Sequence, residues 1–393
     1  MKLLAKAEKN SDIWFLIKAS FVFFLLRLPS LFEPNWYGDE GIYQVLGAGI
    51  RTGRLLYKEI FDNKPPLLYL VYAILNADQF AVRLASLIFG ILALITFFFL
   101  SKKLFNQEGK RKIPFITTSI FGLLLALPLI EGNIANAENF MLFPIIAAGF
   151  LIVNHKERLA EIRKAKKILF LAGLLLGLSF LFKIVSVFDF TAFLIFIILI
   201  YLPNRVVFKS DHLKKEVFVL AKPVSYFILG FTLPILITAL YFLINGALKE
   251  LLVATFVQNV GYVGYGNKFF IPQGLLILKS FILGGFIIFL FLKRTKLSKT
   301  SLFILVWFAF SLFNAYFSQR PYTHYVLVLI PSLSLLIGLI LWDKKYQIFN
   351  LILFLLSLFF ILKDFNFYMK IIPYYQNYAS LLMNQKTVSA YQA

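Results

Sequence analysis

The stretch that decides the fold is QFAVRLASLIFGILALITFFFL, residues 79–100. It contains a single charged residue, Arg83, and it is as long as the roughly 20 apolar residues that a helix needs to cross a bilayer. Ten further apolar blocks of similar length occur along the chain. The sequence therefore predicts an all-α integral membrane protein, a polytopic helical bundle of about eleven spans. The predicted spans are 13–32, 79–100, 114–130, 136–153, 167–182, 185–202, 219–244, 271–292, 301–318, 323–342 and 347–362.

The composition agrees with a membrane protein. Of the 393 residues 60% are hydrophobic and 15% are charged, and the mean hydropathy is +0.81. Soluble domains are about half apolar and about a quarter charged. The chain has no cysteine, which excludes disulfides, thiol nucleophiles and thiolate metal sites. Its three histidines argue against a His-rich metal cage.

The net charge of +21 raises the question of nucleic-acid binding, which the distribution of the charges rejects. Basic residues lie in short clusters between apolar blocks, whereas a nucleic-acid site would gather them on one soluble face. If the N-terminus is cytoplasmic, the cytoplasmic segments hold 25 Lys and Arg residues and the outer segments 11. Because cytoplasmic loops carry the excess of basic residues, we predict this orientation in a cell (inner or plasma) membrane.

We expect one transmembrane domain over residues 1–362 and a short aromatic, amphipathic tail, 363–393, that rests on the outer membrane surface. The longest outer connection is 33–78, and the interpretable chemistry is concentrated there. Asp39 and Glu40 are adjacent, just beyond the first span. The residues that follow have helical spacing and predict a surface helix whose apolar stripe is Ile42, Val45, Leu46 and Gly49. Asp39 is then either a functional carboxylate or the cap of that helix.

A second feature of this loop is Asp62-Asn63-Lys64-Pro65-Pro66. The two prolines stop a helix and hold the preceding residues extended, so Lys64 sits at a rigid turn before a short apolar helix at 67–76. A lysine at the membrane boundary binds a lipid phosphate as a point charge, or it extends its ammonium into water without a specific partner.

The ordered set of DE-x2-Y, Gly53-x3-Tyr57 and D-x-KPPL resembles the polytopic C-type (GT-C) glycosyltransferases. The similarity is to the branch with protein O-mannosyltransferases, lipid A aminoarabinose transferases and RgtA/B/C/D-like enzymes. Later segments agree with that resemblance, which covers most of the chain. They are Ala137-Glu138, the stretch GLSFLFK ending at Lys183, and Arg320-Pro-Tyr-Thr-His324-Tyr325.

The resemblance implies transfer of a sugar from a polyprenyl-phosphate donor to a hydroxyl of a lipid, polysaccharide or protein acceptor on the outer face, with inversion. By resemblance, Asp39 is the general base and Glu40 orients substrate or shares the charge. Repulsion between the two adjacent carboxylates should raise the pKa of one of them. We assign the donor phosphate or sugar to residues that the motifs and the topology put on the same side: Tyr43, Tyr57, Asp62, Lys64, Glu138, Lys183, Arg320, His324 and Tyr325.

Several of these residues also have a structural interpretation. Glu138 lies in the first turn of a predicted helix, where a carboxylate is stabilising in any case. Lys183 lies in a minimal loop between apolar residues, and Asp189 nearby is a possible ion-pair partner that would make both structural. In the outer segment 246–272, Gln258, Asn259 and Tyr262 are candidates for sugar contacts, although an interfacial aromatic belt explains the tyrosine equally well.

No carboxylate and histidine cluster has convincing ligand spacing, so we predict no tightly held metal and leave metal dependence open. The main alternative function is a transporter or flippase of lipid-linked sugars, which would place paired charges near mid-bilayer in matching halves. The chain has no matching halves, and its charges within spans lie mostly near the ends. A non-catalytic scaffold would have lost the Asp-Glu pair, and a polymer ligase would need a large late loop instead. We therefore favour the glycosyltransferase.

Overall fold

The computed structural model describes residues 2–33, 36–105, 111–154, 162–202, 210–271, 273–365, 367 and 371–387. Within these residues, each predicted span coincides with an apolar helix. These helices are α1 (Lys2–Arg27), α4 (Gln79–Leu104), α5 (Ile113–Ala126), α6 (Ala137–Asn154), α7 (Ile162–Phe182), α8 (Val187–Tyr201), α9 (Ser210–Ile244), α12 (Gly274–Lys293), α13 (Lys299–Ala315), α14 (Ile330–Trp342) and α15 (Gln347–Asp364). By length and hydropathy, nine segments of the described chain can cross a membrane, and α5 and α13 are shorter apolar helices. The chain is a multi-pass helical membrane protein.

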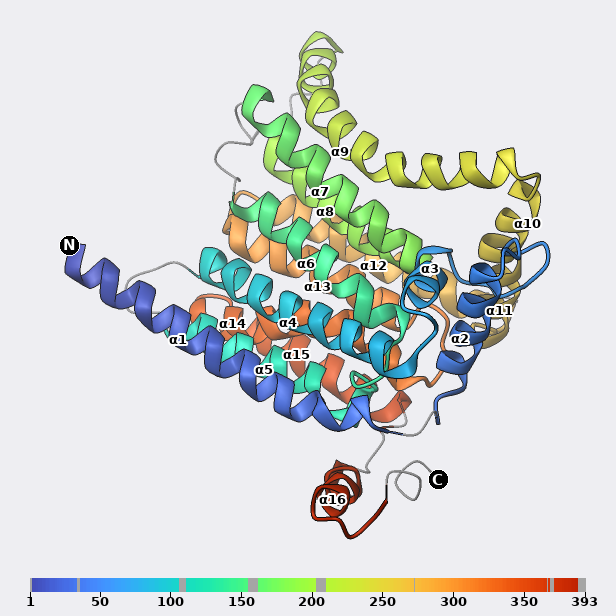
Figure 1. Cartoon of the computed structure of the whole chain (residues 1–393). Coiled ribbons are helices and arrows are strands. Elements are labelled where there is room, and N and C mark those ends of the chain that lie inside the picture. Colours follow the sequence, from blue (N-terminus) through green and yellow to red (C-terminus); the bar gives the residue numbers. More distant parts are fainter. Residues whose placement is uncertain are drawn as a thin grey trace.

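The remaining elements are short. They are η1 (Leu28–Leu31), α2 (Gly38–Arg51), α3 (Leu67–Ile74), η2 (Pro128–Ile130), η4 (Ile184–Ser186), α10 (Leu248–Leu252), the π-helical turn η5 (Val253–Val257), α11 (Gln258–Gly266), η6 (Thr323–Leu329) and α16 (Ile371–Leu382). The predicted surface helix is confirmed as α2, and the predicted helix at 67–76 is α3, which ends at Ile74. Helices α2, α3, α10 and α11 gather at the end of the bundle away from the N-terminus (Figure 1).

The long helices lie side by side, and the closest pair is held by glycines. A Cβ atom on Gly173 of α7 would lie 2.1 Å from the carbonyl oxygen of Phe227, and one on Gly177 would lie 2.3 Å from that of Phe231. Small residues four apart let two helices approach backbone to backbone, which replaces the hydrophobic driving force that lipid does not supply. Helix α9 therefore packs directly on α7 around Phe227 and Phe231.

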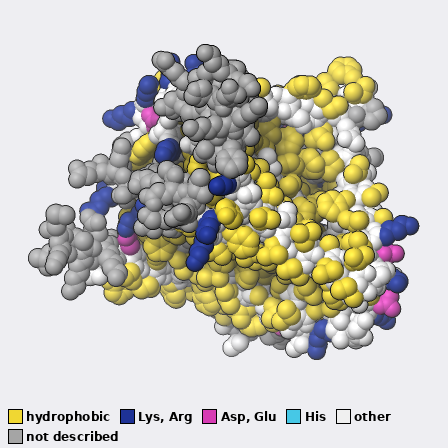
Figure 2. All heavy atoms as spheres, turned by 90° about the horizontal axis from the view of Figure 1, so that it is seen from above, with side chains coloured by type: hydrophobic (Ala, Val, Ile, Leu, Met, Phe, Trp, Pro, Cys, Tyr) yellow, Lys and Arg dark blue, Asp and Glu magenta, His cyan; other side chains and the backbone are white. Residues whose placement is uncertain are grey.

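The outer surface of the bundle is apolar. Figure 2 shows a broad hydrophobic surface, with Lys and Arg side chains toward its edges. Large apolar side chains on α9 and α12 are strongly exposed, among them Leu236 (63%) and Phe281 (75%). A water-soluble monomer rarely exposes so large an apolar area, whereas a membrane protein presents it to lipid.

The orientation and the division at residue 362 stay predictions. Parts of segments 101–113, 154–167 and 203–222, whose basic residues contribute to the predicted orientation, lie outside the described residues, as do residues 388–393 of the tail. In the described part of the tail, α16 lies across the direction of the long helices (Figure 1), and the Tyr375 hydroxyl donates to the carbonyl of Leu26 at 2.9 Å.

A buried charge network fixes α2 to the bundle. The guanidinium of Arg83 on α4 is fully buried and donates to both carboxylate oxygens of Glu40 on α2, at 3.1 and 2.6 Å. The backbone N–H of Ala135, just before α6, donates to the same carboxylate at 2.7 Å. Arg83 also donates to the carbonyl oxygens of Ser30 and Glu33. Two segments, α4 and the residue before α6, thus hold the first turn of α2, and the segment of Ser30 and Glu33 fixes Arg83.

Candidate active site

Asp39 lies in the first turn of α2 and points away from the helix backbone. The helix begins at Gly38 with Tyr37 as its N-cap, and no side chain caps it. The expectation that Asp39 caps the helix is therefore wrong. Its carboxylate instead accepts a hydrogen bond from the Tyr43 hydroxyl at 2.9 Å and forms an ion pair with the Lys64 ammonium at 3.3 Å.

The loop that carries Lys64 is clamped through its backbone. The Tyr57 hydroxyl donates to the carbonyl of Lys64 at 2.6 Å, and the N–H of Lys64 donates to the Tyr69 hydroxyl at 3.2 Å. Tyr69 in turn donates to Asp62 at 2.6 Å, and Asp62 lies 3.9 Å from the Lys64 ammonium. Tyr57 is buried and has a φ of 70°, a conformation that non-glycine residues rarely adopt. With the backbone fixed, only the Lys64 side chain is able to move between partners.

The electrostatics of Asp39 differ from the sequence-based expectation. Burial raises the pKa of the Asp39 carboxyl, but the Lys64 ammonium and the Tyr43 hydroxyl stabilise the carboxylate more strongly. Its pKa consequently lies below the ordinary value of 3.8. The expected rise from repulsion by Glu40 is wrong for Asp39, because Glu40 faces Arg83 and is neutralised there.

Glu40 is turned toward the bundle. It is 2% exposed, its carboxylate is occupied by Arg83 and Ala135, and it is not among the described residues that line the cavity. The structure thus contradicts the expectation that Glu40 orients substrate or shares the charge of Asp39. Its role is to hold α2 against the bundle.

A second carboxylate and lysine pair lies deeper. Glu138, in the first turn of α6, forms an ion pair with Lys183, which follows α7. The Lys183 ammonium also lies 4.5 Å from the centre of the Tyr325 ring. Pairing of Lys183 with Asp189 is wrong, because Asp189 is buried on α8 and accepts a hydrogen bond from the Trp307 indole at 2.7 Å. The second oxygen of Glu138 is buried without a hydrogen-bond partner.

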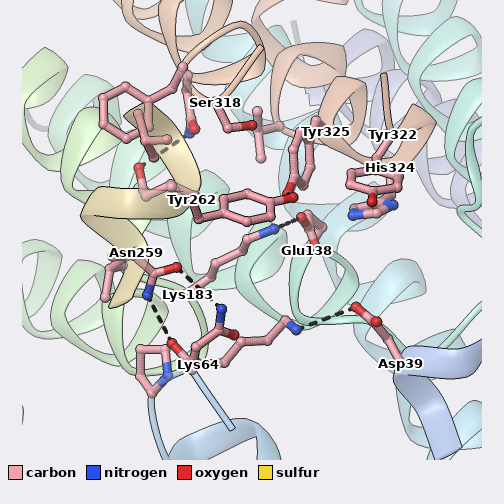
Figure 3. Close-up of a pocket in the computed structure, with 18 of the residues that line it drawn as sticks. Asp39, Lys64, Glu138, Lys183, Asn259, Tyr262, Ser318, Tyr322, His324 and Tyr325 are labelled. Carbon is pink, nitrogen blue, oxygen red and sulfur yellow. Dashed lines mark hydrogen bonds and ion pairs between the residues drawn. The ribbon is translucent and has the colours of Figure 1, made fainter. Parts of the chain in front are cut away.

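Both pairs line one cavity of about 640 Å³ at the end of the bundle where α2 and α11 lie. Figure 3 shows Asp39 with Lys64 on one side and Glu138 with Lys183 on another. Seven of the residues predicted from sequence line it: Asp39, Asp62, Lys64, Glu138, Lys183, His324 and Tyr325. Four described residues of the same prediction do not line it: Glu40, Tyr43, Tyr57 and Arg320. Tyr43 and Tyr57 contact cavity residues from behind: the Tyr43 hydroxyl donates to Asp39, and the Tyr57 hydroxyl donates to the backbone carbonyl of Lys64.

Arg320 lies behind the cavity wall. Its guanidinium is 4.8 Å from the centre of the Tyr262 ring, whose hydroxyl lies 2.8 Å from that of Tyr325. Arg320 is not among the described residues that line the cavity, and its assignment to the donor phosphate stays a prediction. Asn259 of α11 also lines the cavity, and its amide donates to the carbonyl of Asn63 at 3.0 Å, which joins α11 to the first loop.

Tyr37 and Glu131 are among the cavity residues that the sequence analysis did not name. Tyr37 precedes α2, and its hydroxyl lies 3.2 Å from Nδ1 of His324. Glu131, in the turn after η2, accepts hydrogen bonds from the Thr323 hydroxyl at 2.6 Å and lies 2.7 Å from Nδ1 of His324. The only sequence signal for Glu131 is that it is the single charged residue in the connection 131–135 between two predicted spans.

No group of three or more His, Asp or Glu side chains that is able to hold a metal ion occurs in the part of the chain that the structure describes.

Comparison with known proteins gives similarity to solved structures alone. No protein-family model and no curated protein matches the chain. The Archaeoglobus fulgidus oligosaccharyltransferase, in complex with Zn and sulfate, is 15% identical with a TM-score of 0.47, over 96% of this chain and 57% of that chain. The same enzyme with an inhibitory peptide and a dolichol-phosphate is 14% identical with a TM-score of 0.47, over 98% of this chain and 60% of that one.

ArnT from Cupriavidus metallidurans, bound to undecaprenyl phosphate, is 13% identical with a TM-score of 0.42, over 98% of this chain and 74% of that chain. The chain spans less than two thirds of the length of the oligosaccharyltransferase. At these identities and scores the similarity does not bear on function.

Proposed function

We propose that this chain is a membrane glycosyltransferase that moves a sugar from a polyprenyl-phosphate donor to a hydroxyl of a lipid, polysaccharide or protein acceptor on the outer face, with inversion. The observation that carries the proposal is a single cavity that joins one partly exposed carboxylate, Asp39, to two ammonium groups, Lys64 and Lys183. Transfer from a sugar phosphate needs both kinds of group. A base must take the proton of the attacking hydroxyl, and cations must stabilise the phosphate that leaves.

Asp39 is the candidate base. Its carboxylate takes the proton of the acceptor hydroxyl as the hydroxyl oxygen forms a bond to the anomeric carbon. The bond between that carbon and the phosphate oxygen breaks on the opposite face, so the configuration inverts. The proton ends on Asp39, and the electron pair of the broken bond ends on the polyprenyl phosphate. The low pKa of Asp39 keeps it ionised, and thus ready to accept a proton, over the whole neutral range.

The lysines are the candidate phosphate ligands. Each of them is paired with a carboxylate in this structure. A phosphate that enters the cavity competes with Asp39 for the Lys64 ammonium, whose side chain alone is free to turn. As Lys64 moves to the phosphate, Asp39 loses the charge that lowers its pKa and becomes a stronger base. Donor binding thereby prepares the base for the acceptor.

The apolar part of the wall supports a lipid-linked donor. Phe256, Val260, Leu276 and Phe317 line the cavity beside the polar groups and come from η5, α11, α12 and the segment after α13. A prenyl chain requires such a wall, whereas a sugar nucleotide does not. The asymmetry of Lys and Arg residues supports an outward-facing cavity.

The test is transfer by purified protein in lipid nanodiscs from a panel of synthetic polyprenyl-phosphate sugars to envelope lipid and peptide acceptors. We expect the wild type to transfer from at least one donor, and Asp39→Asn to lose more than a hundredfold in rate, the lower range for general base catalysis. Asp343→Asn, which alters a carboxylate in the turn after α14 and outside the cavity, is the matched control and should transfer normally.

Full activity of Asp39→Asn would remove Asp39 as the base. If the wild type is inactive with every donor but moves a fluorescent polyprenyl-phosphate sugar across liposome membranes, the chain is a flippase and the proposal is wrong.

A further inference from the structure

Glu131 has a backbone conformation that the surrounding turn imposes. Its φ is 59°, in the left-handed region that is unfavourable for a residue with a side chain. The next residue, Gly132, allows the turn to close, because a Cβ atom there would lie 2.1 Å from the carbonyl oxygen of Leu125. Strained residues that the surrounding structure fixes are concentrated at functional sites. The turn points the carboxylate of Glu131 into the cavity wall, against η6.

The contacts of Glu131 determine the state of the His324 ring. A carboxylate only accepts hydrogen bonds, so the 2.7 Å contact between Oε2 of Glu131 and Nδ1 of His324 places a proton on Nδ1. The other oxygen of Glu131 accepts from Thr323, which fixes the carboxylate itself. No described residue forms a hydrogen bond with Nε2 of His324, although His324 lines the cavity. In the neutral ring, Nε2 is a hydrogen-bond acceptor.

The surroundings of Nε2 fit a hydroxyl better than a phosphate. The groups that face His324 are the carboxylates of Glu131, Asp39 and Glu138 and the aromatic side chains of Tyr37, Tyr322 and Tyr325. Phosphate oxygens are negative and accept hydrogen bonds, so they would be repelled by these carboxylates and by an unprotonated Nε2. A sugar carries no charge and brings hydroxyl donors.

Two further features indicate a sugar at this wall. The free oxygen of Glu138, which is 1% exposed, is a second buried acceptor without a partner. The ring of Tyr322 is stacked on His324 at 5.7 Å and remains half exposed, so it offers an aromatic face beside the two acceptors. Figure 3 shows Tyr322 and His324 together on the side of the cavity that also holds Glu138 and Asp39.

We propose that Glu131 is a positioning residue that holds His324 with its proton on Nδ1, so that Nε2 accepts a hydrogen bond from a hydroxyl of the transferred sugar. This inference rests on the proposed function for the identity of the ligand, but its first test does not. The cavity is then divided in two. The lysines take the phosphate, and the wall formed by Glu131, His324 and Tyr322 takes the sugar.

The first test is the tautomer of His324, measured by ¹⁵N NMR of protein labelled at histidine. The chain has three histidines, and a His324→Gln variant assigns the resonance. We expect the wild type to show Nδ1–H and an unprotonated Nε2. Glu131→Ala should lose this preference, while Glu131→Gln, whose amide oxygen still accepts, should keep it. Thr323→Val is the matched control, because it removes the other contact of Glu131, and should also keep Nδ1–H.

A wild-type ring protonated on Nε2, alone or together with Nδ1, would overturn the proposal, because Nε2 would then be a donor. An Nδ1–H ring unchanged in Glu131→Ala would overturn the positioning role. Thermal midpoints of the variants show whether they fold.

The second test separates sugar from phosphate. Affinities are measured for undecaprenyl phosphate and for the undecaprenyl-phosphate sugar that the transfer assay selects. Glu131→Ala should bind the sugar-bearing lipid about five- to tenfold more weakly, as expected for one lost hydrogen bond, and undecaprenyl phosphate as tightly as the wild type does. Equal weakening of both would assign His324 to the phosphate and overturn the sugar site. The tautomer of His324 is measured without any sugar donor. Failure to find a sugar donor would therefore refute the proposed function, whereas the NMR measurement would still test the positioning role of Glu131.

Discussion

Replacement of Glu40 is expected to destabilise the protein without altering the chemistry of the cavity. In Glu40→Gln the Arg83 guanidinium loses its charged partner while it stays fully buried. Removal of one partner of a buried ion pair costs about 3–5 kcal/mol. The carboxylate of Glu33 lies 3.8 Å from Arg83 and compensates in part, so we expect the lower end, about 3 kcal/mol.

Arg83→Met should cost more, about 5 kcal/mol, because it leaves the Glu40 carboxylate buried with the N–H of Ala135 as its remaining donor. In the double variant neither charge is left unpaired. Its cost should be smaller than the sum of the two single costs, with a coupling of about 2 kcal/mol or more.

The assay is unfolding in mixed micelles at rising SDS fraction, followed by the fluorescence of the four tryptophans. Glu250→Gln, which removes a carboxylate from α10 outside this network, is the control. If Glu40→Gln unfolds at the same SDS fraction as the wild type, the assignment of Glu40 to the anchoring of α2 is wrong. Loss of transfer in a Glu40→Gln protein of normal stability would return Glu40 to the catalytic site.

Three other predictions concern charge and packing. Lys64→Met removes the ammonium that lowers the pKa of Asp39, so the acid limb of the pH–rate profile should move to higher pH. An unchanged acid limb would show that this limb does not report the ionisation of Asp39. Burial raises the pKa of Glu33 from 4.5 to about 7, despite the opposing charge of Arg83. The folded state therefore binds this proton more tightly than the unfolded chain does, so the free energy of unfolding should fall as the pH rises from about 4.5 to about 7. Glu33→Gln should abolish the contribution of this residue to the fall, as measured by denaturation curves at several pH values in that range. Gly177→Ala should lower the SDS midpoint because its Cβ would meet α9, whereas Gly284→Ala, with nothing within 4 Å, should not; equal midpoints would refute the close packing of α7 on α9.

The sequence by itself determined the helices. Whether a segment crosses the membrane depends on the length and polarity of one apolar run, which is a local property, so each predicted span coincides with a helix of the structure. The structure of the first loop was also predictable from the sequence, because prolines and the spacing of apolar residues determine local backbone conformation. They predicted α2, α3 and the turn that presents Lys64.

Only the tertiary structure decided which charges meet. Asp39 and Glu40 are adjacent in sequence, yet consecutive residues of a helix point about 100° apart, so one faces the cavity and the other faces Arg83. Lys183 pairs with Glu138, 45 residues away, in place of the nearby Asp189. Glu131 contacts His324 of η6, 193 residues further along the chain, and the residues next to Glu131 in the sequence do not predict this contact. A partner across the bundle is fixed by how whole helices pack, and no local pattern of residues encodes that packing.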